Sequence, residues 1–229
     1  MRRAWPLLAA CLVLLPWPVL AHAIGGQDAA FVAASQGFHF WPFFYLGAKH
    51  MVTGTDHLLF LLGVIFFLYR LRDVALYVTL FSLGHSLTLL AGVPLNIRAD
   101  PYLVDAVIGF SVVWKAFDNL GGFRSLFGRQ PDNRIVVAGF GLAHGFGLAT
   151  KLQDLQLNPN GLVGNLIAFN LGVEIGQLLA LTAMLLLILA WRRTRAFGRT
   201  AFAANLAIMT AGFLLVEFQL AGYFLGETA

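Results

Sequence analysis

The sequence predicts an all-α membrane protein, a polytopic bundle of about six transmembrane helices that follows a cleaved signal peptide. Two observations predict this class. Hydrophobic residues make up 59% of the 229 residues and charged residues only 11%, and the mean hydropathy is +0.78. Such a balance is typical of a chain surrounded mostly by lipid. Apolar runs near the ~20 residues that a helix needs to cross the hydrocarbon core also recur along the chain.

Residues 1–23 have the three parts of a secretory signal. Arg2 and Arg3 give a positive start, residues 7–15 are apolar, and residues 21–23 form a small-x-small cleavage site. The alternative is an uncleaved first helix. Cys11 is the one cysteine of the chain and lies in this segment, so the mature protein would hold no disulfide and no thiolate ligand. Residues 24–229 would then form a single transmembrane domain.

The mature chain would begin with a short periplasmic or interfacial lead-in over residues 24–49. Aromatic residues such as Trp41, Phe44 and Tyr45 are typical of the membrane–water interface. Six apolar runs follow, and the predicted spans are 52–69, 74–93, 102–119, 135–151, 162–190 and 202–224. The connections between them are short, which favours an up-and-down helix bundle.

Basic residues predict the orientation. The loops after the first, third and fifth spans carry nine arginines, whereas the opposite side carries only Lys49, Arg98 and Lys151. Because cytoplasmic loops are the more basic ones, both mature termini would be periplasmic in a bacterial inner membrane. The formal net charge is +4, and most of the basic residues lie in the arginine-rich loops, where they set the orientation, so we infer no nucleic-acid partner.

Two imidazoles and a carboxylate stand where the first span begins. In a continuous helix, His50 and His57 would lie on one face but about 10 Å apart, too far to bind one ion. Gly54 offers a break at which His50 could fold back toward Asp56 and His57. An aspartate near hydrocarbon costs roughly 2 to 3 kcal/mol unless something pairs with it.

Other spans add ionisable groups at similar predicted depth: His85 on the second, His144 on the fourth and Glu174 on the fifth. Imidazole together with carboxylate suits divalent Ni, Co, Zn or Fe. The predicted metal ligands are therefore His50, Asp56, His57, His85, His144 and Glu174, with a secondary polar lining of Ser82, Ser86, Asn170 and Gln177.

Charged residues near the span ends are expected to play simpler roles. Asp105 and Glu217 lie near the outer ends of their spans and are expected to be interfacial. Lys115 and Asp118 lie near the cytoplasmic end of the third span, where local pairing suffices.

At these residues the chain resembles the HupE/UreJ family, named for hydrogenase and urease accessory proteins and regarded as nickel permeases. The resemblance rests on His50, Asp56 and His57 followed by LLFLLG, then SLGHSLTL at 82–89, GLAHGFGLA at 141–149 and FNLGVEIGQ at 169–177. The wording is most similar to the second subgroup, since the fourth-span block reads His-Gly-Phe-Gly rather than His-Gly-x-Glu. The resemblance implies passage of nickel, or cobalt, through the inner membrane to supply enzymes such as hydrogenase or urease. The resemblance also implies that His50, Asp56 and His57 are the residues that handle the metal.

The leading hypothesis is a facilitator for a divalent metal ion rather than an enzyme. An ion that must leave again is held with modest affinity, so we expect transported Ni²⁺ or Co²⁺ and no tightly bound cofactor. The sequence has no nucleotide-binding motif, so the driving force would be the membrane potential, a gradient, or capture by a cytoplasmic metallochaperone. Neutral histidine binds metal, so acid should lower uptake.

Two other classes use the same residues. In an intramembrane zinc hydrolase, three histidines would hold zinc and Asp56 or Glu174 would activate water, although the sequence has no HExxH pattern. A membrane serine protease is disfavoured further, because the sequence has no Gly-x-Ser-x-Gly turn. In a haem electron carrier, two histidines would be axial ligands. No sequence feature selects the number of chains in an assembly.

Overall fold

The computed structural model of the chain describes residues 27–155 and 158–226, and the predicted signal peptide lies outside them. Helices joined by short loops make up these residues, with no strand among them, which confirms the all-α class. The helices are α2 Gln27–Ala34, α3 Phe40–Thr53, α4 Thr55–Ile65, α5 Leu71–Gly92, α6 Pro101–Asn119, α7 Gly122–Phe127, α8 Asn133–Asp154, α9 Leu162–Arg192 and α10 Phe197–Leu225.

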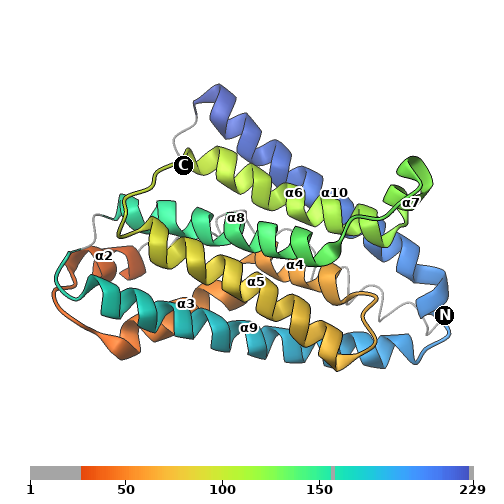
Figure 1. The fold of residues 1–229 in the computed structure, drawn as a ribbon, viewed down its shortest axis with the longest axis horizontal. Coiled ribbons are helices and arrows are strands. Elements are labelled where there is room, and N and C mark those ends of the chain that lie inside the picture. Colours follow the sequence, from red (N-terminus) through yellow and green to blue (C-terminus); the bar gives the residue numbers. More distant parts are fainter. Residues whose placement is uncertain (1–26, 156–157, 227–229) are drawn as a thin grey trace.

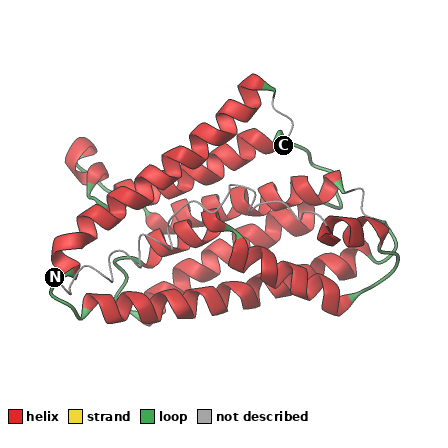
Figure 2. Ribbon diagram, turned by 180° about the vertical axis from the view of Figure 1, so that it is seen from behind, coloured by secondary structure: helices red, strands yellow, loops and turns green. Residues whose placement is uncertain are grey.

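The long helices lie roughly side by side, and α4 runs through their middle (Figures 1 and 2). Three helix pairs dominate the packing: α3 with α9, α5 with α8, and α6 with α10. The short helix α4 contacts α6, α9 and α10, and its side chains Phe60, Leu61 and Ile65 are fully buried. Most residues of α4 are therefore enclosed by the rest of the bundle.

Within residues 27–155 and 158–226, four helices are long and apolar enough to cross a membrane by length and composition, namely α5, α8, α9 and α10. Helix α6 has almost the predicted bounds, but it carries Asp105, Lys115 and Asp118. Helix α4 is apolar and has 11 residues, so the first span differs from the predicted 52–69.

Helix α4 ends early because an arginine binds the carbonyl groups that follow its last turn. The Arg192 guanidinium donates to the carbonyl oxygens of Ile65 at 2.9 Å and Leu68 at 2.7 Å, and also to that of Phe66. These carbonyls belong to the last four of a helix or to the turn beyond it, which lack intrahelical donors. Arg192 thus stabilises the turn that leads into α5.

The lead-in predicted as interfacial is helical, and its second helix belongs to the bundle. A Cβ atom placed on Gly47 of α3 would collide with the backbone carbonyl of Phe169 on α9, and one on Gly172 with that of Phe44. Glycine at both positions lets the two backbones touch, as small residues do between membrane helices. Helix α3 therefore delivers His50 into the interior.

Candidate metal site

The helix break expected at Gly54 is present and brings His50 to His57. Helix α3 ends at Thr53 and α4 begins at Thr55, while Gly54 has an extended backbone with ψ of 99°. The His50 and His57 rings lie 5.2 Å apart between centroids, about half the separation that a continuous helix would impose. The break therefore places His50 beside α4's first turn.

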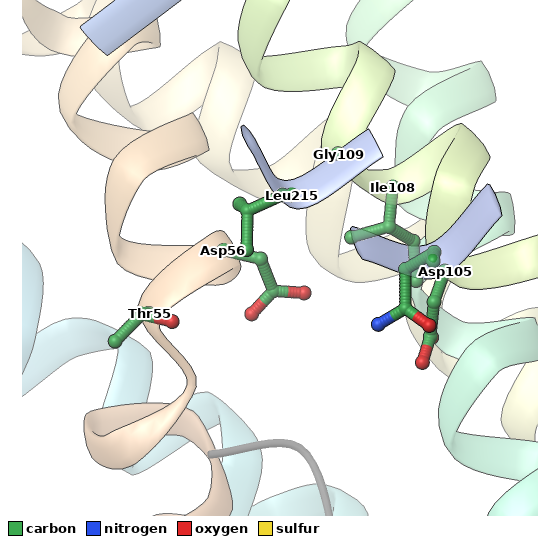
Figure 3. A pocket seen from close by; sticks show the side chains of 7 residues that line it. Thr55, Asp56, Asp105, Ile108, Gly109 and Leu215 are labelled. Carbon is green, nitrogen blue, oxygen red and sulfur yellow. The ribbon is translucent and has the colours of Figure 1, made fainter. Parts of the chain in front are cut away.

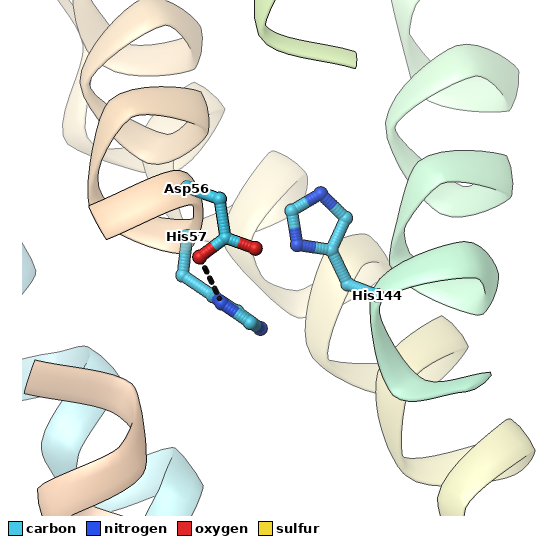
Figure 4. Close-up of side chains that lie close together, drawn as sticks. All are labelled: Asp56, His57 and His144. Atoms are coloured by element: carbon cyan, nitrogen blue, oxygen red, sulfur yellow. Dashed lines mark hydrogen bonds and ion pairs between the residues drawn. The ribbon is translucent and has the colours of Figure 1, made fainter. Parts of the chain in front are cut away.

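Asp56 and His57 of α4 meet His144 of α8 in the centre of the bundle. Each offers one ligand atom, and these atoms lie within 4.8 Å of one another (Figure 4). The three residues are 1%, 1% and 0% exposed. A carboxylate and two imidazoles this close, in a place with little access to water, have the chemistry of a transition-metal site.

Hydrogen bonds indicate which nitrogen of each ring can carry the lone pair that a metal ion needs. Ser111 on α6 has one hydroxyl proton, which it donates to the Ile108 carbonyl at 2.6 Å. Its oxygen lies 3.0 Å from Nε2 of His144 and can accept from that nitrogen, and in this tautomer Nδ1 carries the lone pair of the ring. In the same way His57 donates from Nδ1 to Asp56 Oδ1 at 3.0 Å, which leaves the lone pair on Nε2.

This pattern matches metal-binding histidines, whose second ring nitrogen usually donates to a carboxylate or another polar group. Asp56 orients His57, and its carboxylate also belongs to the close group. Ser111 orients His144. The sequence reading did not identify Ser111, although its spacing of i, i+4 and i+7 with Lys115 and Asp118 marks a polar face on α6.

His85 is a further donor next to the group. Its ring lies 5.8 Å from that of His57 and is 1% exposed, and neither ring nitrogen has a hydrogen-bond partner among the described residues. A Cβ atom on Gly145 would collide with the His85 carbonyl, so glycine lets α5 and α8 bring His85 and His144 together. Buried polar nitrogens of this kind fit a ligand or a water molecule.

Phenylalanine rings enclose the histidines. Phe60 and Phe81 lie 5.3 and 5.1 Å from the His144 ring, and Phe169 lies 6.1 Å from the His50 ring. His57 lies 4.7 Å from His144. These are contact distances between aromatic side chains. They leave no space for a haem macrocycle between the imidazoles.

Glu174 does not join the histidines. It is exposed on α9 together with Leu171, Ile175 and Leu178, and it accepts a hydrogen bond from Ser86 at 3.4 Å. The predicted polar lining lies at the same α5–α9 contact rather than around the histidines. Its bonds run from Asn170 to Ser86 at 2.9 Å and from Ser82 to Gln177 at 3.1 Å.

Two ion pairs lie on α6, one near each end. Asp105 was expected at the interface but is only 9% exposed, and its Oδ2 binds the Lys151 ammonium of α8 at 2.8 Å. Lys115 pairs with Asp118 at 2.6 Å, as local pairing predicts. The polar face of α6 is therefore turned inward along most of its length.

A family model described as HupE / UreJ protein matches residues 26–227, nearly the whole chain. The matched region contains the histidine group and every helix named above. No curated protein and no solved structure matches the chain.

Proposed function

The chain belongs to the HupE/UreJ family, and from this premise we propose that it is a membrane facilitator for a divalent transition-metal ion, with nickel as the first candidate and cobalt as the second. The observation that carries the proposal is the buried group of Asp56, His57 and His144, whose ligand atoms lie within 4.8 Å. Apolar helices around this group support a membrane protein. Ionisable side chains enclosed by membrane helices are costly, and such side chains typically line a pathway for an ion or a substrate.

The donor set agrees with a borderline metal ion. Two imidazole nitrogens and a carboxylate oxygen, with His85 and His50 next to them, suit Ni²⁺, Co²⁺ or Zn²⁺. In our proposal the ion exchanges part of its water shell for Nε2 of His57, Nδ1 of His144 and the Asp56 carboxylate. His85 on α5 is the next donor, and exchange between neighbouring donors lets the ion move on.

We place the chain in a bacterial inner membrane with both mature termini in the periplasm, since the arginine-rich loops would then be cytoplasmic. The partners in this proposal are the lipid bilayer, the transported ion and a cytoplasmic metallochaperone that takes the ion after it leaves. Hydrogenase or urease would be the enzymes supplied. Glu174, exposed on α9, is left out of the ligand set.

Radioactive nickel uptake in cells that express the chain tests the proposal. We expect His57→Ala and His144→Ala to lower uptake at least roughly tenfold, since changes to orienting residues alone cost about 10- to 100-fold. His39→Ala is the matched control, because His39 is an exposed histidine outside the group. Cobalt should compete with nickel more strongly than magnesium does.

Protein abundance in the membrane must be equal for all variants. Nickel uptake that is the same in cells with and without the chain, or that survives both histidine substitutions, would refute the proposal. Strong competition by zinc over nickel and cobalt would change the metal and keep the mechanism.

A further inference from the structure

A polar pocket adjoins the histidine group, on the side of the group that the predicted orientation places toward the periplasm. It opens between α4, α6 and α10 (Figure 3). Its polar lining is Thr55, Asp56, Asp105 and Gln219, and the rest of its wall is mostly apolar. Asp56 belongs both to this pocket and to the histidine group. An ion bound to Asp56 in the pocket would therefore already touch a residue of the histidine group.

Asp105 is the feature that points to a ligand. Its side chain is 10% exposed, its Oδ2 binds Lys151, and its Oδ1 has no hydrogen-bond partner in the described part of the chain. Leaving such an oxygen unsatisfied costs about 1–3 kcal/mol or more for a charged group. Figure 3 shows Asp56 and Asp105 on opposite sides of the pocket.

The pocket differs from the histidine group in chemistry, because its polar side chains offer carboxylate, amide and hydroxyl groups and no imidazole. Oxygen donors suit hard or hydrated divalent cations. We propose that Asp56 and Asp105 hold a hydrated divalent cation before it reaches the histidines, and that the Lys151 ammonium limits how tightly it is held. This inference rests on the proposed function for its role in transport.

Lys151 acts here as an internal counter-ion. Its ammonium lies 2.8 Å from Asp105 Oδ2 and so neutralises part of the charge that would attract a cation. Without the Lys151 charge, the Asp105 carboxylate would hold the ion more tightly and release it more slowly. The pair therefore favours rapid exchange over affinity, which a conducting site needs.

Electron paramagnetic resonance of Mn²⁺ tests the pocket without transport, because Mn²⁺ prefers oxygen ligands and its free hydrated signal is lost on binding. With purified protein in detergent, we expect Asp105→Asn to weaken Mn²⁺ binding roughly tenfold, as the loss of a charged partner does. Lys151→Met should strengthen it roughly fivefold by removing a nearby positive charge. Glu217→Gln, an exposed carboxylate of α10 outside the pocket lining, is the control.

The double variant Asp105→Asn with Lys151→Met removes both charges and leaves neither unpaired, so it separates loss of the site from misfolding. We expect it to bind Mn²⁺ as weakly as Asp105→Asn alone. Binding within twofold of the wild type in both variants that lack Asp105 would overturn the site. Unchanged or weaker binding in Lys151→Met would overturn the role of Lys151.

Nickel uptake then separates this inference from the proposed function. Asp105→Asn should raise the half-saturating nickel concentration, while Lys151→Met should lower it together with the maximal rate. If uptake depends on His57 but both variants match the wild type, the pocket has no role in transport and the facilitator stands. If the wild type takes up no nickel but its Mn²⁺ binding depends on Asp105, the pocket stands and the facilitator fails.

Discussion

Replacing Ser111 by alanine tests whether the orientation of one imidazole sets the affinity for metal. A His144 that binds metal through Nδ1 donates its Nε2–H to the Ser111 oxygen, 3.0 Å away, and both residues are fully buried. Without the hydroxyl, the Nε2–H group of a buried ring is left unsatisfied, at a cost of about 1–3 kcal/mol. The ring escapes this cost by moving its proton to Nδ1, but it then loses the lone pair that faces Asp56 and His57.

Either outcome weakens metal binding. Orienting residues of metal ligands contribute roughly 10- to 100-fold to affinity, and tenfold corresponds to about 1.4 kcal/mol. We therefore expect Ser111→Ala to raise the Kd for Ni²⁺ at least tenfold while the protein remains folded, because only one buried oxygen atom is removed.

Isothermal titration of the purified protein with Ni²⁺ measures this change, with the thermal midpoint as a check on folding. Ser82→Ala is the matched control, since it also removes a hydroxyl hydrogen bond, at 3.1 Å to Gln177, but not one to a histidine. Wild-type Ni²⁺ affinity in Ser111→Ala would contradict an orienting role for Ser111. An equal loss of affinity in Ser82→Ala would contradict it as well.

Three other substitutions follow from the same geometry. Gly54→Ala places a Cβ atom 3.0 Å from Nδ1 of His57, so we expect nickel uptake to fall at equal protein abundance in the membrane; unchanged uptake would show that the break tolerates a side chain. Arg192→Met removes the donors to the carbonyls after α4 and should cost ~2 kcal/mol, seen as a lower Tm in detergent; an unchanged Tm would contradict this role. Glu174→Gln should leave uptake within about twofold of the wild type, because a single exposed charge away from the ligands contributes little; a large loss would restore Glu174 to the pathway.

The sequence predicted the helices whose apolar runs are long and the break at Gly54. Helices α5, α6 and α8 begin and end within a few residues of the predicted spans, because their composition changes sharply at each end. Helix α3 was missed as a bundle member. Its aromatic residues resemble an interfacial segment, and its contact with α9 depends on Gly47 and Gly172, which lie far apart in the sequence.

For the site, the sequence predicts how far along a helix a side chain lies but not which way the helix is turned. That is enough for His57 and His144, which meet. It fails for Glu174, because the rotation of α9 is set by packing of Gly172 and Gly176 against α3, which turns Glu174 outward. Hydropathy along a single span contains no information about that contact.

Helix α6 explains how a helix with three charges can belong to the interior of an apolar bundle. Asp105 pairs with Lys151 near one end and Lys115 with Asp118 near the other, and Asp118 also accepts from Gln130 at 2.6 Å. The intact pairs add no net charge to the interior. Removing one partner of a buried pair leaves the other charge uncompensated, which costs about 3–5 kcal/mol.

Between these pairs, Ser111 offers His144 a neutral hydroxyl. A charged partner at that position would either repel the ion or hold it through an added carboxylate. The neutral contact fixes the ring and leaves the charge of the site to Asp56. A single carboxylate beside two imidazoles offers fewer charged ligands than two carboxylates would, and a conducting site requires modest affinity, so we expect Ser111→Asp to trap nickel on the purified protein and to slow its uptake.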